Sequence, residues 1–274
     1  MTHSTPRFAV QLAAVASLIA AGCTAPLPAR RTAQTDGARA VHRTAEPAWV
    51  QVGAFTTQFD LEAADRVHNV TTAATRLDGL ILKAGRSWSF NAAVGRRTLE
   101  GGWKLAPTLV LEGARLDVGG GICQVSTTVY NAALFADLKV EQRHPHSRPI
   151  RYVPLGRDAT VSWGTKDLVL SNPHPFPIRF EAFVNHDRLT VRALAPRALA
   201  YEVRLESGNA EPATPRKELQ VLAEPDRLAV GGLWVKLYRH RVRDGSIYET
   251  ERVGGSSFYP YRIVPPLSSS TEVR

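Results

Sequence analysis

The sequence predicts an α+β fold, in which helices pack on a mainly antiparallel sheet and a β-rich extension follows at the C-terminal end. Two observations lead to this expectation. Before Leu138, two stretches carry apolar residues at steps of three and four, which is typical of helices with one buried face. After Arg148, short runs of β-branched and aromatic residues are each broken by Pro, Gly, Asp or Asn, which is typical of strands.

The helical part contains two expected helices with a glycine-rich loop before the second. Residues 61–82 predict the first helix, and two weaker candidate strands follow at 88–91 and 108–111. Gly119–Gly121 predict a loop with unusual backbone angles. A second helix of about three turns is then expected over 125–138.

The β-rich part predicts a series of short strands. Their ranges are 150–153, 159–163, 168–170, 178–184, 189–194, 201–205, 233–242 and 246–253. The last two ranges flank Arg243-Asp244-Gly245, which is typical of a hairpin turn. Pro212–Pro215 form the clearest internal boundary within this part.

The N-terminal end predicts export. Arg7 precedes a run of apolar and small residues, Phe8–Ala21, that is too short for the roughly 20 residues of a spanning helix. The run leads through Gly22 into Cys23, and this sequence resembles a lipobox, after which Cys23 would be the lipidated first residue of the mature protein. The alternative is an ordinary signal peptide, with Cys23 lost or incidental.

These patterns divide the chain into five expected segments. They are a lipoprotein signal peptide at 1–22, a flexible tether at 23–48, the main domain at 49–184, a β-rich C-terminal region at 185–267 and a disordered tail at 268–274. The tether assignment rests on Ala, Thr, Arg and Pro without an apolar period.

The net charge of +9 points to acidic partners. An exported basic protein meets anionic lipid head groups and the carboxylates of the cell wall. We find no nucleic-acid-reading motif, and the basic residues are scattered rather than gathered in a stripe, so we expect no nucleic-acid partner. The expected partners are the membrane, through lipidated Cys23, and peptidoglycan or another wall polymer.

Cys123 is the main candidate for chemistry, because it would be a lone thiol in an oxidising compartment if Cys23 carries lipid. It lies near the start of the second expected helix, where exposed N–H groups and the helix dipole favour a thiolate. Gly120 and Gly121 allow a substrate to approach the backbone, and N–H groups around Cys123 and Gln124 are candidates to stabilise an oxyanion.

Partners for a cysteine nucleophile follow Cys123 in the chain. His144 or His146 is the candidate base, and Asp158 is the candidate carboxylate that orients the imidazole. Two alternatives remain open, namely a packed and unreactive cysteine and a zinc site formed by Cys123, His144 and His146. The zinc site lacks a fourth ligand, so we expect neither a metal nor a cofactor.

Five ordered motifs together resemble the VanW family. They are Ser87–Asn91 with Val94–Thr98, Gly101–Pro107, Gly119–Leu134, Arg143–Ser147 and Gly156–Val161. The resemblance implies a role in the cell envelope, at peptidoglycan, for a family whose activity is not established. It places these residues at motif positions: Gly121, Cys123, Gln124, Ser126, Thr127, His144, His146 and Asp158.

Two hypotheses follow. In the first, the protein is an envelope lipoprotein whose Cys123 carries out acyl transfer or amide hydrolysis on wall peptides, with His146 favoured over His144 as the base. In the second, it is a non-catalytic wall-binding or scaffolding lipoprotein, in which Gly120, Gly121, Gln124, Ser126 and Thr127 contribute to a peptide or glycan pocket. The sequence determines neither the substrate nor the membrane leaflet nor the oligomeric state.

Overall fold

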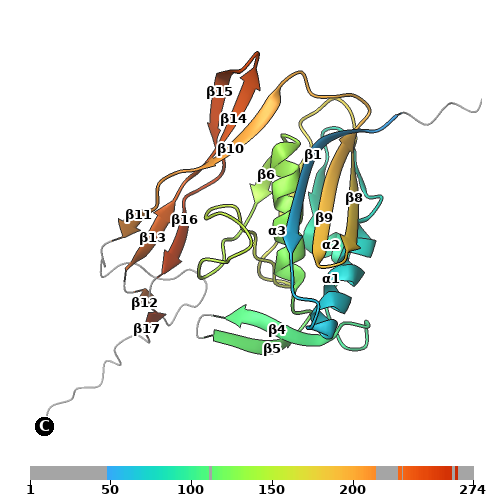
Figure 1. Cartoon of the computed structure of the whole chain (residues 1–274), viewed down its shortest axis with the longest axis vertical. Helices are drawn as coiled ribbons and strands as arrows, with labels where there is room; N and C mark the ends of the chain where they lie inside the picture. The colour runs from blue at the N-terminus through green and yellow to red at the C-terminus, as the bar shows by residue number, and fades with distance from the viewer. Residues whose placement is uncertain (1–47, 111–112, 214–227, 230, 261–262, 265–274) are drawn as a thin grey trace, which may run out of the picture. The chain divides into compact units, whose positions relative to one another are not determined.

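The computed structural model describes residues 48–110, 113–213, 228–229, 231–260 and 263–264 of the chain, all of them within one compact unit, Glu46–Arg274 (Figure 1). The expected signal peptide, Cys23 and the tail lie outside the described residues. Antiparallel sheets and a few helices make up this unit, so the predicted α+β class is confirmed. No helix in the described ranges is both long and apolar enough to span a membrane.

The main sheet has four antiparallel strands in the order β1-β9-β8-β2. Their bounds are Val50–Gln58 for β1, Arg188–Ala195 for β9, Ile178–Asn185 for β8 and Ile81–Leu82 for β2. Helices α1 (Ala64–Leu77) and α3 (Ile122–Phe135) pack against this sheet. The short helix α2 (Phe90–Val94) begins at Ser89, whose side chain caps it by accepting a hydrogen bond from the backbone N–H of Ala92.

The first expected helix is real but shorter than the sequence predicts. Helix α1 ends at Leu77 rather than at residue 82, because Asp78 takes an extended conformation and Gly79 has a positive φ of 75°. The Gly79 N–H then donates to the carbonyl of Phe180 in β8. Residues Ile81–Leu82 therefore join the sheet as β2 instead of continuing the helix.

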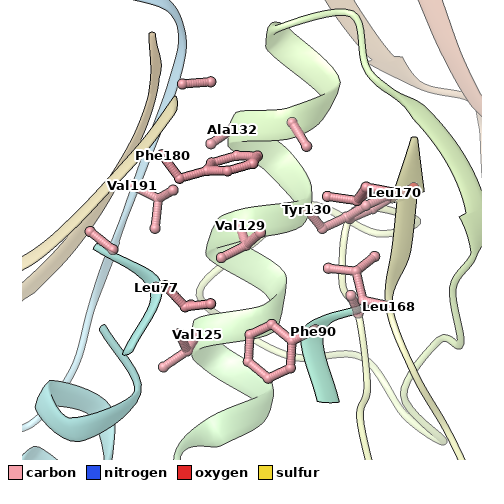
Figure 2. Packing of buried hydrophobic residues seen from close by; sticks show 14 of the residues in the cluster. Leu77, Phe90, Val125, Val129, Tyr130, Ala132, Leu168, Leu170, Phe180 and Val191 are labelled. Carbon is pink, nitrogen blue, oxygen red and sulfur yellow. The ribbon is translucent and has the colours of Figure 1, made fainter. Parts of the chain in front are cut away.

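Helix α3 is buried on all sides because it lies between two sheets. A second sheet, in the order β3-β7-β6, is formed by Ser87–Ser89, Val169–Ser171 and Lys139–Gln142. In Figure 2, Phe180 and Val191 lie on one side of α3, and Leu168 and Leu170 lie on the other. An element with neighbours on both faces has no solvent-exposed stripe, which explains why even its polar residues are buried.

The C-terminal part is made of small antiparallel sheets, as expected. One joins β10 (Glu202–Ser207), β14 (Leu237–Arg243) and β15 (Ser246–Arg252), and another joins β11 (Glu211–Ala213), β13 (Gly232–Val235) and β16 (Ser257–Pro260). A two-stranded ladder joins β12 (Leu228–Ala229) to β17 (Ile263–Val264). Outside this part, β4 (Leu105–Val110) and β5 (Gly113–Val118), which precede α3, form a separate two-stranded ladder.

The hairpin expected at residues 243–245 is confirmed. Strands β14 and β15 pair up to Arg243 and Ser246, and the two residues between them, Asp244 and Gly245, have φ values of 51° and 78°. Two consecutive positive φ values are the signature of a type I′ turn, whose twist matches that of the paired strands.

Two expected strands are absent from the described structure. Residues 150–153 form no strand, and residues 159–163 take part only in the isolated bridges His144↔Thr160 and Ser162↔Lys166. The reason is that backbone groups of this segment bond to side chains of α3: the N–H of Ala159 donates to Thr127, and the carbonyl of Ala159 accepts from Ser126. The segment is thereby fixed to a helix rather than paired in a sheet.

The division of the chain at residues 184 and 185 stays a prediction. This position falls before the last residue of β8, and β8 forms one hairpin with β9 within the main sheet.

Close packing of β1 on α3 leads to a stability prediction. A Cβ atom on Gly53 would lie 2.4 Å from the carbonyl oxygen of Ala132 and 2.6 Å from the backbone nitrogen of Ala136. We expect Gly53→Ala to lower the free energy of unfolding by about 1–3 kcal/mol, because strand and helix must move apart. Denaturant titration followed by circular dichroism measures this change.

The matched control is Gly255→Ala. A Cβ atom at Gly255 would meet nothing within 4 Å, so we expect this variant to stay within about 0.5 kcal/mol of the parent. Equal effects of the two substitutions would contradict the close approach of β1 to α3.

Candidate active site

Cys123 is the second residue of α3 and is partly exposed. The helix begins directly after Gly121, whose φ of 107° turns the chain into the first turn. The Cys123 thiol lies 3.5 Å from the carbonyl oxygen of Val161. Its backbone N–H finds no acceptor among the described residues, as is usual in the first turn of a helix.

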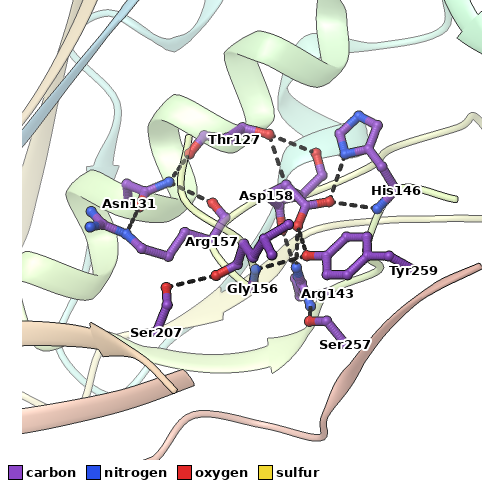
Figure 3. Close-up of polar contacts among 12 residues, drawn as sticks. Thr127, Asn131, Arg143, His146, Gly156, Arg157, Asp158, Ser207, Ser257 and Tyr259 are labelled. Atoms are coloured by element: carbon purple, nitrogen blue, oxygen red, sulfur yellow. Dashed lines mark hydrogen bonds and ion pairs between the residues drawn. The ribbon is translucent and has the colours of Figure 1, made fainter. Parts of the chain in front are cut away.

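His146 connects Cys123 to Asp158. The Nδ1 atom of His146 lies 2.7 Å from Oδ2 of Asp158, and the backbone N–H of His146 donates to the same oxygen (Figure 3). The His146 ring is also close enough to the Cys123 side chain to lower the pKa of the thiol. Because Nδ1 faces the carboxylate, Nε2 is the ring nitrogen that remains for the sulfur. His146 thus interacts with both Cys123 and Asp158.

The Asp158 carboxylate is buried and fully engaged. Its Oδ1 atom accepts hydrogen bonds from the guanidinium of Arg143, at 2.7 Å, and from the hydroxyl of Tyr259. Arg143 also donates to the backbone carbonyl of Asp158 and to Ser257, and the Tyr259 hydroxyl accepts from the N–H of Gly156 (Figure 3). Strand β16 in this way fixes the orientation of the carboxylate from about 100 residues away in the sequence.

Sequence reasoning missed Arg143, Tyr259 and Ser257. Arg143 stands in the quoted motif directly before His144, so a search for a cation beside the acid could have found it. Nothing in the sequence near Tyr259 or Ser257 relates them to Asp158, and only the folded chain brings them together.

Opposing effects set the ionisation of Asp158 and His146. Burial raises the pKa of Asp158, but the hydrogen bond from His146 and the charge of Arg143 outweigh it and hold the pKa at about 2. Burial lowers the pKa of His146, but the hydrogen bonds to Asp158 and Cys123 outweigh it and raise the pKa to about 9. At neutral pH the carboxylate is charged and the imidazole is protonated.

The same contacts lower the pKa of Cys123. Burial favours the neutral thiol, but the hydrogen bond and positive charge of His146, the contact with Val161 and the charge of Arg97 together stabilise the thiolate. The lowered pKa of Cys123 and the raised pKa of His146 both favour the thiolate–imidazolium form of the pair. The His146 contribution to stability is complete below about pH 6.5 and is lost as the pH rises through about 9, whereas that of Asp158 is lost as the pH falls from about 4 to about 2.

His144 lies apart from this arrangement. Its Nε2 atom lies 2.9 Å from the side-chain nitrogen of Gln142, and its backbone carbonyl accepts from the N–H of Thr160. Burial and the charges of Lys166 and Arg143 lower its pKa. Of the two histidines that the sequence offers, the structure brings His146 to Cys123.

The expected binding residues Gln124, Ser126 and Thr127 form hydrogen bonds within the protein. Gln124 accepts a hydrogen bond from Arg66 and donates to the carbonyl of Gln58, while Ser126 and Thr127 both contact the backbone of Ala159. All three side chains are buried. Their role toward a ligand stays a prediction, and their observed contacts hold α3 against its neighbours.

Gly120 and Gly121 shape the loop before Cys123. A Cβ atom on Gly120 would lie 2.3 Å from the carbonyl oxygen of Ala106, and one on Gly121 would meet Val70 at 3.0 Å. Only glycine allows the loop to pass this close to β4 and α1. Their role in binding a ligand also stays a prediction.

Tyr152 is a further polar group near the thiol that sequence reasoning did not single out. Burial together with the charge of Cys123 raises the pKa of its hydroxyl. It therefore stays a neutral hydrogen-bond donor. Among the described residues, no three His, Cys, Asp or Glu side chains are grouped as metal ligands.

Comparison with known proteins places this site within a matched segment. Residues 65–194 match a family model described as VanW like protein. The chain is 42% identical over 132 residues to "Uncharacterized protein YoaR" of Bacillus subtilis (strain 168), an alignment that covers 48% of this chain and 44% of that protein. No solved structure shows a significant match.

A second relative is more distant. The chain is 31% identical over 113 residues to "Vancomycin B-type resistance protein VanW" of Enterococcus faecalis (strain ATCC 700802 / V583), which covers 39% of this chain and 41% of that protein. The chain thus matches less than half the length of each of these relatives. The matched segment includes Cys123, His146 and Asp158, whereas Ser257 and Tyr259 lie beyond it.

The electrostatics of the site predict the reactivity of Cys123. In a Cys23→Ser background, we expect iodoacetamide to alkylate Cys123 with an apparent pKa below the free-cysteine value of about 8.5. His146→Gln removes the positive charge, so we expect the apparent pKa to rise and the rate at pH 7 to fall by about tenfold or more. Stopped-time alkylation followed by mass spectrometry gives both rates.

His144→Gln is the matched control for this experiment. It removes an imidazole two residues away that does not contact the thiol, so the pH profile should match that of the parent. A profile that moves with His144 and not with His146 would contradict the proposed pairing.

Proposed function

This chain belongs to the VanW-like family through residues 65–194, and we propose that it is a cysteine-dependent enzyme that hydrolyses or transfers acyl groups at amide bonds of cell-wall peptides. The single observation that carries the proposal is the position of His146 between Cys123 and Asp158. Nucleophile, base and orienting acid in this order are the arrangement of cysteine acyl-transfer enzymes.

The first chemical step uses the ion pair as it stands. The Cys123 thiolate attacks the carbonyl carbon of an amide and forms a C–S bond. The tetrahedral intermediate then collapses, the C–N bond breaks, and the His146 imidazolium gives its proton to the departing amine. The product of this half-reaction is a thioester on Cys123 with neutral His146.

The second step regenerates the enzyme. Neutral His146 takes a proton from water, or from a second amine, which attacks the thioester carbon, and the C–S bond breaks to return the thiolate. Water gives hydrolysis and an amine gives transfer. Asp158 holds the His146 ring in one orientation and stabilises its positive charge throughout.

The oxyanion of each tetrahedral intermediate requires hydrogen-bond donors close to it. The Cys123 backbone N–H supports this role, because it is unpaired among the described residues and lies at the positive end of α3. The Tyr152 hydroxyl is a second donor near the sulfur.

The proposed place of action is the cell envelope, with Cys23 as the lipid anchor. The lipobox-like sequence before Cys23 and the net charge of +9 support this location, since wall polymers and lipid head groups are anionic. The resistance named for the Enterococcus relative supports a connection with peptidoglycan and defines no substrate for this chain.

Activity on wall peptides tests the proposed chemistry. We expect soluble muropeptides incubated with the parent protein to give new products and a thioester adduct on Cys123, both detected by mass spectrometry. Cys123→Ala should abolish both, and Asp158→Asn should reduce the turnover rate on the order of 10²–10⁴-fold, because the imidazole is no longer oriented.

One variant serves as the matched control for this experiment. His144→Gln should retain the parental rate. Binding to peptidoglycan without any product or adduct would contradict catalysis and would favour a non-catalytic wall-binding protein.

The lipid anchor has a separate test. When the full chain is produced in bacteria fed radiolabelled palmitate, we expect the label in the parent and in Cys123→Ala, but not in Cys23→Ala. The unlabelled variant should also move from the membrane fraction to the soluble fraction, because it lacks the acyl chains. Equal labelling of the parent and Cys23→Ala would contradict lipidation at Cys23.

A further inference from the structure

Arg97 lies beside the nucleophile without a carboxylate partner. Its charge acts on the Cys123 thiol, and its aliphatic part packs on the loop before α3, where a Cβ atom on Gly119 would meet Arg97 Cγ at 2.8 Å. None of the described residues forms a salt bridge with it. A cation in this position is available to a negatively charged group close to the sulfur.

The hydrogen bonds of Arg97 leave most of its guanidinium unused. Only Nη1 donates, to the side-chain oxygen of Asn91 at 2.8 Å and to the carbonyl of Gly95 at 2.9 Å. Nη2 and Nε have no acceptor among the described residues. These two nitrogens form an edge of the guanidinium, and such an edge binds a carboxylate through two parallel hydrogen bonds.

Neighbouring residues hold the guanidinium in place. The Arg97 Cζ atom lies 5.9 Å from the ring centre of Trp163, whose side chain is 46% exposed. Trp163 is two residues after Val161, the carbonyl of which contacts the Cys123 thiol. Asn91, which accepts from Arg97, is itself fixed by donating to the carbonyl of Lys166 at 2.8 Å.

The nearest acid does not neutralise Arg97. Asp167 acts on it only at a distance, since the Asp167 carboxylate accepts hydrogen bonds from Ser89 and from the backbone N–H groups of Asn91 and Leu168. Of the two negative groups that act on Arg97, Cys123 has the larger effect and Asp167 the smaller, and acylation of Cys123 removes the larger one.

From this arrangement we propose that Arg97, supported by Trp163, is a carboxylate-binding subsite next to Cys123, which selects peptide substrates carrying a free carboxylate near the reacting carbonyl. The inference rests on the proposed function and narrows it to one substrate class. Arg97 contacts the substrate in this proposal, whereas His146 transfers protons at the reacting atoms and Asp158 positions His146.

Two small reagents of the same shape and different charge test the subsite without a substrate. Iodoacetate is anionic and iodoacetamide is neutral, and each reacts with the thiolate by displacement of iodide to form an S–CH₂ bond. The ratio of their rates on Cys123, measured in the Cys23→Ser background, does not depend on the fraction of thiolate. The ratio reports only how strongly the site attracts the carboxylate of iodoacetate.

We expect Arg97→Gln to lower the ratio of iodoacetate to iodoacetamide rates by about three- to tenfold relative to the parent. Arg97→Lys should retain part of the preference. Arg96→Gln is the matched control, because it removes the adjacent, exposed arginine, and its ratio should equal that of the parent.

Salt gives an independent measurement on the parent protein, which does not require that Arg97→Gln folds. The iodoacetate rate should fall between 0.05 and about 0.5 M NaCl more steeply than the iodoacetamide rate. A ratio unchanged by Arg97→Gln and by salt, with normal iodoacetamide reactivity, would overturn the subsite and leave the nucleophile standing. A thiol that reacts with neither reagent would overturn both proposals.

Discussion

The buried carboxylate of Asp158 is the charge around which the site is organised. Removing a carboxylate from water costs several kcal/mol unless charges and hydrogen bonds replace the lost hydration. Here the guanidinium of Arg143, the hydroxyl of Tyr259 and both the ring and the backbone N–H of His146 replace it. Because these groups come from separate parts of the chain, satisfying one charge fixes the geometry of all of them.

Helix α3 supplies the second constraint, which is rigidity. It is packed between the sheet that contains β8 and β9 and the sheet that contains β7, so its first turn cannot shift without disturbing both faces (Figure 2). Ser126 and Thr127 then fix the segment around Ala159 to the same helix. Cys123 and the segment that follows Asp158 are thus both attached to α3. Hydrogen bonds to this helix, rather than the conformation of a loop, hold the distance between the nucleophile and the acid.

The balance of charge at the site favours anions. Positive charge on His146 is favoured beside Arg143 and Arg97, and negative charge is favoured on Asp158 and Cys123. Arg143 is engaged by Asp158, and His146 is shared between the acid and the sulfur. In Arg97, by contrast, Nη2 and Nε have no acceptor among the described residues. The same side chain therefore helps to lower the pKa of the Cys123 thiol and is proposed to bind the carboxylate of the substrate.

The sequence by itself determined the α+β class, the helical nature of α1 and α3, the β14–β15 hairpin and the candidate residues Cys123, His146 and Asp158. Local periodicity, turn chemistry and residue type encode these features within a few neighbouring positions. Sequence did not determine that residues 150–153 and 159–163 form no strand; in the second segment, both backbone groups of Ala159 bond to side chains of a helix about 30 residues away in the sequence. The sequence favoured His146 over His144, but the contact of His146 with Asp158 and the support of Asp158 by Tyr259 were decided only by the tertiary structure, because burial of a charge depends on contacts between segments up to about 100 residues apart.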